Sequence, residues 1–77
     1  MEPIEILRVQ KYLRDTFRLD TISLKKRTNK SDSVEVYVGD EFVGIVFKDE
    51  EDDEVSYAFQ MAILEMDLPD AASVQKR

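Results

Sequence analysis

The stretch "VEVYVGDEFVGIVF", Val34 to Phe47, decides the fold, because it is typical of a β-hairpin. Two runs rich in β-branched and aromatic residues flank Gly39-Asp40, a pair suited to a two-residue type II′ loop with glycine in the first central position. That loop places these residues opposite one another: Val38 and Glu41, Tyr37 and Phe42, Val36 and Val43, Val34 and Ile45. A loop one residue longer would pair Glu35 with Ile45 and mix apolar with polar faces, so the sequence predicts the two-residue loop and its register.

An amphipathic helix is predicted upstream, from about Pro3 to Phe17, and proline is tolerated in a first turn. Apolar residues recur at three- or four-residue spacing and fall in one arc: Ile6, Val9, Leu13 and Phe17. Charged residues cluster on the opposite side: Arg8, Lys11, Asp15 and Arg18. One apolar stripe needs one partner surface, so we expect this helix to lie across a sheet.

Two further segments have strand patterns. Ile22 and Leu24 alternate with polar residues, as in a half-buried strand, and Asn29 to Asp32 have turn chemistry. Residues 55–68 fit two periods. Apolar residues at every second position from Val55 to Ile63 predict a strand, whereas a period of 3.6 predicts a helix. The unbroken alternation favours the strand, and the helix remains the alternative.

These elements predict an α+β fold, with an N-terminal helix packed on a four-stranded antiparallel meander. The alternative order is helix, three strands, helix. With 77 residues the chain has room for one small core, so we expect a single domain over residues 1–68. Pro69 ends the last element, and residues 69–77 are expected to form a frayed C-terminal tail.

The composition argues against several chemistries. The sequence has no cysteine and no histidine, so no thiolate can bind zinc or act as a nucleophile, and no imidazole titrates near neutral pH. It also has no glycine-rich phosphate loop and no nucleophile elbow. We therefore expect no enzymatic activity, no catalytic residue, no cofactor and no bound metal.

Location and partner class are also constrained. The N-terminus lacks the basic start and apolar run of a signal peptide, and no segment approaches the ~18 consecutive apolar residues of a membrane helix. A cytoplasmic protein without membrane contact is expected. The net charge is 11 − 17 = −6, which repels phosphate backbones and disfavours nucleic-acid binding.

Six consecutive carboxylates, Asp49 to Glu54, follow the hairpin. Their alternate residues resemble the first ligands of a calcium loop, but Glu54 stands where such a loop needs glycine, so we interpret the run as a solvated turn. In a meander this turn shares one end of the sheet with the basic turn after the first strand. The two turns predict a charged rim of Lys25, Lys26, Arg27, Lys30, Asp49, Glu51 and Asp53.

The sheet face opposite the helix is the predicted interaction surface. It would carry Tyr37, Phe42, Val46 and Ala58, with Ala62 beside them. A contiguous apolar patch on a small protein is typical of an interface. We therefore expect a small protein–protein interaction domain that forms a homodimer or binds an unidentified protein partner. The alternative is a nucleic-acid-binding module that uses the basic helix face and the turn from Lys25 to Lys30.

The blocks "GDEFVGIVFKDEED" and "SYAFQMAIL", with "LRVQKYLRDTF" upstream, carry a resemblance to a known family. From Ile4 to Leu68 the chain resembles a family of short, uncharacterised bacterial proteins of unknown function. The resemblance implies a stand-alone bacterial domain and brings no catalytic or binding residue with it. The "GDEF" letters have one glycine before the acids, whereas the motif found in cyclic-dinucleotide synthases has two and sits in a much larger domain.

Overall fold

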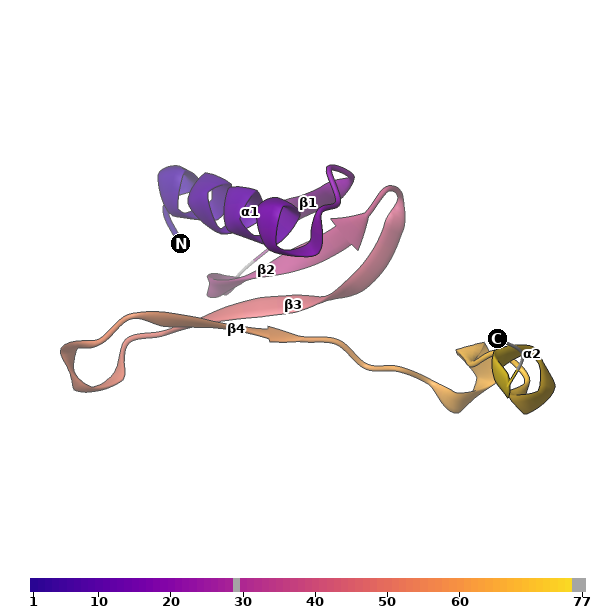
Figure 1. The fold of residues 1–77 in the computed structure, drawn as a ribbon. Coiled ribbons are helices and arrows are strands. Elements are labelled where there is room, and N and C mark those ends of the chain that lie inside the picture. Colours follow the sequence, from indigo (N-terminus) through magenta and orange to yellow (C-terminus); the bar gives the residue numbers. More distant parts are fainter. Residues whose placement is uncertain (29, 76–77) are drawn as a thin grey trace.

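One helix lies across one face of a four-stranded sheet, and the C-terminal segment runs away from both (Figure 1). The computed structural model describes residues 1–28 and 30–75, with the backbone alone at residues 30 and 31. The elements are α1 (Pro3–Phe17), β1 (Ile22–Arg27), β2 (Lys30–Val38), β3 (Glu41–Asp49), the 3-10 turn η1 (Glu51–Asp53), β4 (Ser56–Gln60), the 3-10 turn η2 (Glu65–Asp67) and α2 (Ala71–Gln75).

The predicted α+β class is confirmed, since the sheet is antiparallel with strand order β1-β2-β3-β4. The strand interpretation of the segment after the acidic run is confirmed over Ser56–Gln60, so the order helix, three strands, helix does not occur. Pairing stops at Gln60, although the apolar alternation continues to Ile63. Within the expected tail, Ala71–Gln75 forms the short helix α2.

The helix begins and ends as predicted. The Glu5 carboxylate accepts a 3.0 Å hydrogen bond from the Glu2 backbone N–H, which satisfies one open donor of the first turn. Arg18 adopts the left-handed conformation (φ 54°) that ends the helix. The apolar stripe of α1 packs on the sheet and forms one core with it, made of Ile6, Leu13, Ile22, Leu24, Val34, Val36 and Val46.

The hairpin loop is confirmed, but the register beyond it is not. Gly39 has φ +61°, and Val38–Glu41 and Tyr37–Phe42 pair as predicted. A bulge follows, after which Val36 lies opposite Gly44, Glu35 opposite Ile45, and Val34 opposite Val46. The predicted pairs Val36–Val43 and Val34–Ile45 are therefore wrong.

The bulge has a physical reason in Gly44. A Cβ at this position would run into the carbonyl oxygen of Gln60 and lie 2.7 Å from Cε1 of Phe59, so no larger residue fits beneath β4. The extra residue, Val43, moves Gly44 onto the helix side while Val43 itself still packs against the core. Val46 follows Gly44 onto the helix side and is only 1% exposed.

The turn predicted from Asn29 to Asp32 is too long. β2 already begins at Lys30, and Arg27 pairs with Lys30 after an irregularity between Lys26 and Arg27. Asn29 lies outside the described residues. The polar residues after Asn29 therefore begin the strand β2 and do not form a turn.

Candidate interaction site

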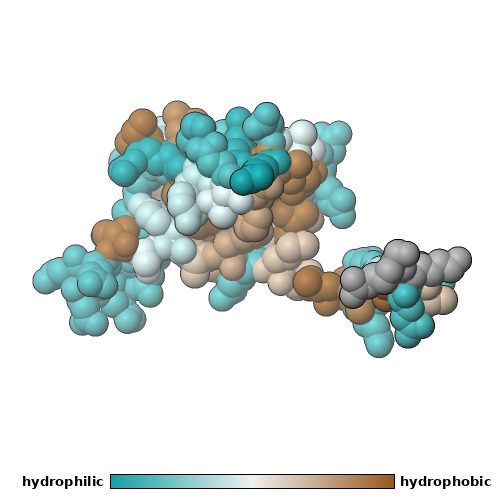
Figure 2. Space-filling model, viewed as in Figure 1, coloured by the Kyte–Doolittle hydropathy of each residue, from teal (hydrophilic) through white to brown (hydrophobic). Residues whose placement is uncertain are grey.

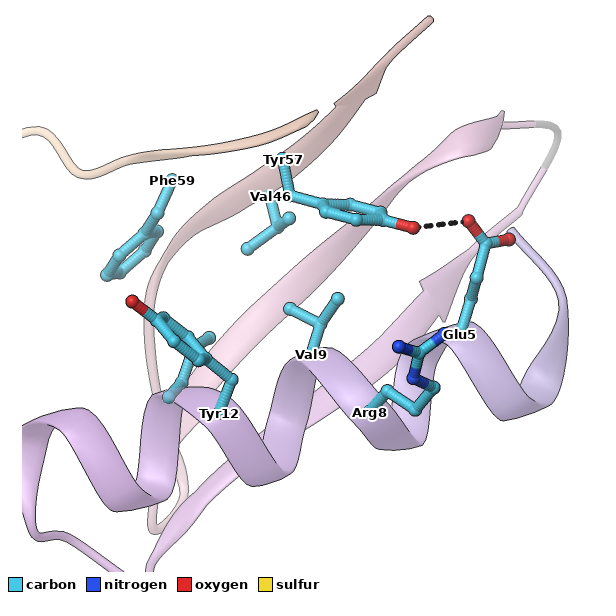
Figure 3. A pocket seen from close by; sticks show the side chains of 8 residues that line it. Glu5, Arg8, Val9, Tyr12, Val46, Tyr57 and Phe59 are labelled. Atoms are coloured by element: carbon cyan, nitrogen blue, oxygen red, sulfur yellow. Dashed lines mark hydrogen bonds between the residues drawn. The ribbon is translucent and has the colours of Figure 1, made fainter. Parts of the chain in front are cut away.

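A groove of about 520 Å³ lies between α1 and β4 on the helix side of the sheet. The helix packs most closely over β1, and this placement leaves β4 at a distance from α1 (Figure 1). Residues from both elements line the groove, with Val46 of β3 as its floor (Figure 3). The lining consists of Glu5, Arg8, Val9, Tyr12, Leu13, Val46, Tyr57 and Phe59.

The walls of the groove are aromatic. Tyr57 and Phe59 come from β4 and face the helix, whereas Tyr12 comes from α1 and is 67% exposed (Figure 3). The Phe59 ring meets Phe17 edge to face, with ring centroids 6.5 Å apart. Gly44 gives this ring its space in the sheet. An apolar trough with a few polar groups at its margin is the usual form of a binding site.

One end of the groove is closed by a charged cluster around Glu5. Its Oε2 atom lies 2.6 Å from the Lys48 ammonium and accepts a 2.6 Å hydrogen bond from the Tyr57 hydroxyl. The Lys48 hydrogen bond, followed by that of Tyr57, lowers the pKa of Glu5 from 4.5 to about 2. The same bonds raise the pKa of Lys48 and of Tyr57. This cluster ties the N-terminal end of α1 to β3 and β4.

Arg8 brings an unpaired positive charge to the same margin. Its side chain is exposed, and no carboxylate forms an ion pair with it among the described residues. Figure 3 shows Arg8 beside Glu5 on the helix wall of the groove. A ligand with an acidic group at this end would therefore meet a cation that is not already neutralised.

The segment from Met61 to Leu68, here called the arm, leaves the body directly after β4 (Figure 1). No described strand pairs with residues 61–64, and the backbone at Leu64 is extended (φ −86°, ψ 139°). Figure 2 shows apolar surface continuing from the body onto the start of the arm. Its large apolar side chains are more than half exposed, up to 85% for Met66, and comprise Met61, Ile63, Leu64, Met66 and Leu68.

The outer face, meaning the sheet face away from α1, holds most of the predicted interaction surface. Tyr37 and Phe42 lie together on it, with ring centroids 5.8 Å apart, and Ala58 follows on β4. The placement of Val46 there is wrong, because the bulge turns it into the core.

The same bulge moves two other apolar residues of β3 outward. Ile45 and Phe47 take positions on the outer face that the sequence prediction did not assign, and Phe47 is 37% exposed. Ala62 lies in the arm, beyond the paired part of β4. The outer face is therefore apolar as expected, with partly different members.

The predicted charged rim is only partly assembled. The strand order places the basic and acidic turns at one end of the sheet, but no ion pair joins the two groups within the described part of the chain. The Lys25 ammonium instead lies 4.4 Å from the Tyr37 ring, and Arg27 donates a hydrogen bond to Ser33. Lys26 is exposed, and the Lys30 side chain lies outside the described residues.

The acidic run forms an exposed turn. Glu51 and Asp53 belong to η1, and Asp49 accepts a 3.0 Å hydrogen bond from the Glu51 backbone N–H. Asp52 and Asp53 have positive φ values of 56° and 62°. Over the residues described, no group of three or more acidic side chains is arranged to hold a metal ion. In the same residues, no helix is both long and apolar enough to cross a membrane.

Sequence reasoning did not identify the groove. Tyr12 and Glu5 lie at the margin of the helical apolar arc, and their role depends on where α1 crosses the sheet. The pairing of Lys48 with Glu5 joins residues far apart in the chain. The one available signal was Gly44 inside a strand pattern, which often marks a bulge or a close backbone approach.

Comparison with known families gives a match that covers most of the fold. Residues 5–67 match the model of a family described as "Protein of unknown function (DUF3126)". The chain belongs to this family. The DUF3126 match spans most of α1, all four strands and most of the arm, so the arm is part of the family's pattern. Neither the comparison with curated proteins nor that with solved structures gives a match.

Proposed function

We propose that this DUF3126 protein is a non-enzymatic protein–protein interaction domain whose partner is a second copy of itself. The observation that carries the proposal is the arm. Its five large apolar side chains are more than half exposed and lie outside the buried core. Exposing so much contiguous apolar surface is unfavourable in water, so a partner surface that covers it lowers the free energy.

Two further features support this proposal. The outer face adds Phe42, which is 50% exposed, to the apolar surface that a partner could cover. The body is small and has no disulfide, and domains of this size often gain stability by association.

The rival hypothesis, nucleic-acid binding, has less support from the described side chains. Lys11 pairs with Asp15, Arg14 donates to the carbonyl of Ile22, and Lys25 stacks on an aromatic ring. The net charge of −6 adds long-range repulsion from phosphates. These contacts leave few basic groups for a phosphate backbone.

Sedimentation equilibrium of the full chain tests the proposal. We expect the apparent mass to rise from 9.0 kDa toward twice that value as the concentration increases from micromolar to millimolar. A mass that stays at 9.0 kDa over this range contradicts the proposal. Replacing an exposed apolar residue outside the arm, as in Leu7→Ser, should not change this result, because Leu7 is exposed to 57% on α1 but does not line the groove. The Leu7→Ser chain should self-associate like the unmodified chain.

A further inference from the structure

Two backbone edges lie next to each other in sequence and both lack a strand partner. β4 pairs with β3 along one edge, and no described strand covers its other edge. Residues 61–64 continue from β4 and also have no strand partner. Unpaired strand edges are templates for pairing with another chain.

We infer that the arm of one copy lies antiparallel along the free edge of β4 of a second copy, and that the second arm does the same in return. The inference rests on the self-association proposed above and names the surfaces that carry it. The arrangement is a two-fold one, in which identical surfaces meet and the contact closes on itself. It joins the two sheets into one continuous sheet.

The side-chain alternation brings Met61 and Ile63 of the arm to the helix side of the sheet. Tyr57 and Phe59 point to the helix side of β4, so Met61 and Ile63 keep that side if the chain stays extended. Antiparallel pairing about an axis perpendicular to the sheet keeps both helices on the same side. Met61 and Ile63 of one copy then lie over the groove of the other.

Length and charge also fit. The four residues 61–64 span roughly 13 Å when extended, close to the roughly 16 Å of a five-residue strand such as β4. Beyond them the arm carries Glu65, which would reach the end of the groove where Arg8 has no carboxylate partner among the described residues. The arm is thus complementary to the groove in apolarity, and its charge complementarity is confined to a contact of Glu65 with Arg8, because the acidic turn from Asp49 to Glu54 lies at the same end.

A second copy fits better than the arm's own body. The arm leaves at Gln60 and runs away past the C-terminal end of α1 (Figure 1). Returning to the free edge of its own β4 would need a tight reversal directly after Gln60. The segment from Gln60 to Leu68 has no glycine and no proline to make such a turn.

Cysteine cross-linking tests the inference, because the chain has no cysteine of its own. Leu64→Cys in one chain is mixed with a tagged chain that carries Ser56→Cys, Ala58→Cys or Gln60→Cys, all on the outer side of β4. We expect the best of these pairs to give about tenfold or more mixed disulfide than the control Ser23→Cys, because docking raises the local thiol concentration. Ser23 is on the same face but at the opposite edge, on β1.

Each other outcome is also informative. If the chain forms dimers by sedimentation but Leu64→Cys prefers none of the β4 positions over Ser23→Cys, another surface carries the dimer. The arm inference then fails while the proposed function stands. If Leu64→Cys and Ala58→Cys within one chain give a monomeric disulfide, the arm folds onto its own body, and the inference is overturned. A chain that remains at 9.0 kDa refutes both proposals.

Charge reversal at Arg8 gives a second readout. Arg8→Glu should weaken dimerisation about two- to five-fold, as expected for one partly exposed ion pair, and this loss should shrink when Glu65→Arg is added. Lys26→Glu is the matched control, since it makes the same charge change on an exposed residue of β1. Equal losses in Arg8→Glu and Lys26→Glu would contradict a specific contact at the groove.

Discussion

The two edges of the sheet are treated differently. At β1, the helix closes the edge with its own side chains: Gln10 accepts a 3.0 Å hydrogen bond from the Leu24 N–H, and Arg14 donates a 2.7 Å hydrogen bond to the Ile22 carbonyl. At β4, the helix stands away, a groove replaces the contact, and the chain continues as an exposed apolar arm.

This difference explains how a small sheet could associate without aggregating. Edge strands invite pairing with other chains, and proteins commonly block them with side chains or charges. If β1 is blocked and β4 is open, another chain can pair only with β4. A two-fold contact between two copies then covers both β4 edges and leaves none for a third chain. The contrast between a closed β1 edge and an open β4 edge is therefore what the following predictions test.

The largest effect is expected at Val46, beneath the groove where the closed and open sides meet. Val46→Asp places an unpaired carboxylate at a site that is 1% exposed, so we expect a loss of about 4–5 kcal/mol, close to the whole stability of a small domain. Urea denaturation measures this loss of stability, and we expect the cooperative unfolding transition to disappear. Ile45→Asp, one residue away on the outer face, should leave the fold intact. Similar damage in both variants would contradict the bulge.

Gly44→Ala is expected to loosen the open side. The added methyl group meets the Gln60 carbonyl and the Phe59 ring, so we expect the free energy of unfolding to fall by about 1–3 kcal/mol. Amide exchange in β4 should speed up more than that in β1. Ser23→Ala on β1 is the control and should change little. An unaltered exchange pattern in Gly44→Ala would show that β4 does not depend on this close approach.

Gln10→Ala is expected to open the closed side. The Leu24 N–H loses its acceptor, which should cost about 1 kcal/mol in chemical denaturation. The exposed edge should also add assemblies larger than the dimer, visible by light scattering. Lys11→Ala, the neighbouring exposed position, serves as control. Equal scattering from both variants would argue that Gln10 does not protect the β1 edge.

The smallest effect at neutral pH is expected at Glu5, and it should disappear in acid. Its folded pKa of about 2 lies below the usual 4.5, so its contribution is complete above pH 4.5 and is lost as pH falls toward 2. Glu5→Gln should therefore flatten the stability profile between these pH values, as followed by thermal unfolding. Asp15→Asn, at an exposed ion pair on the same helix, should keep the slope.

The sequence predicted the parts of the fold that depend on local pattern. Pro3 and the apolar arc that ends at Phe17 predicted the bounds of α1, and Gly39-Asp40 predicted the loop between β2 and β3. The bulge at Val43 was not predicted, because an unbroken register also places apolar residues on one face of the hairpin. What decided it was the space beneath Phe59, which only Gly44 leaves open.

The candidate site depends on where strand pairing ends and on where α1 crosses the sheet, and the alternation of apolar residues predicts neither. The apolar period from Val55 to Ile63 is continuous, yet pairing ends at Gln60 and the rest becomes the arm. The groove exists because α1 crosses the sheet nearer to β1 than to β4, and the contact of Lys48 with Glu5 follows from that placement. The apolar character of the outer face was predicted, but Ile45 and Phe47 lie on it in place of Val46.

Hydrogen exchange at the amides of Met61 to Leu64 tests the central claim most directly. The account predicts that alternate amides in this segment become protected as the chain concentration rises, in step with the dimer mass, because they pair with β4 of a second copy. Fast exchange at all four amides, at concentrations where sedimentation shows a dimer, would contradict it.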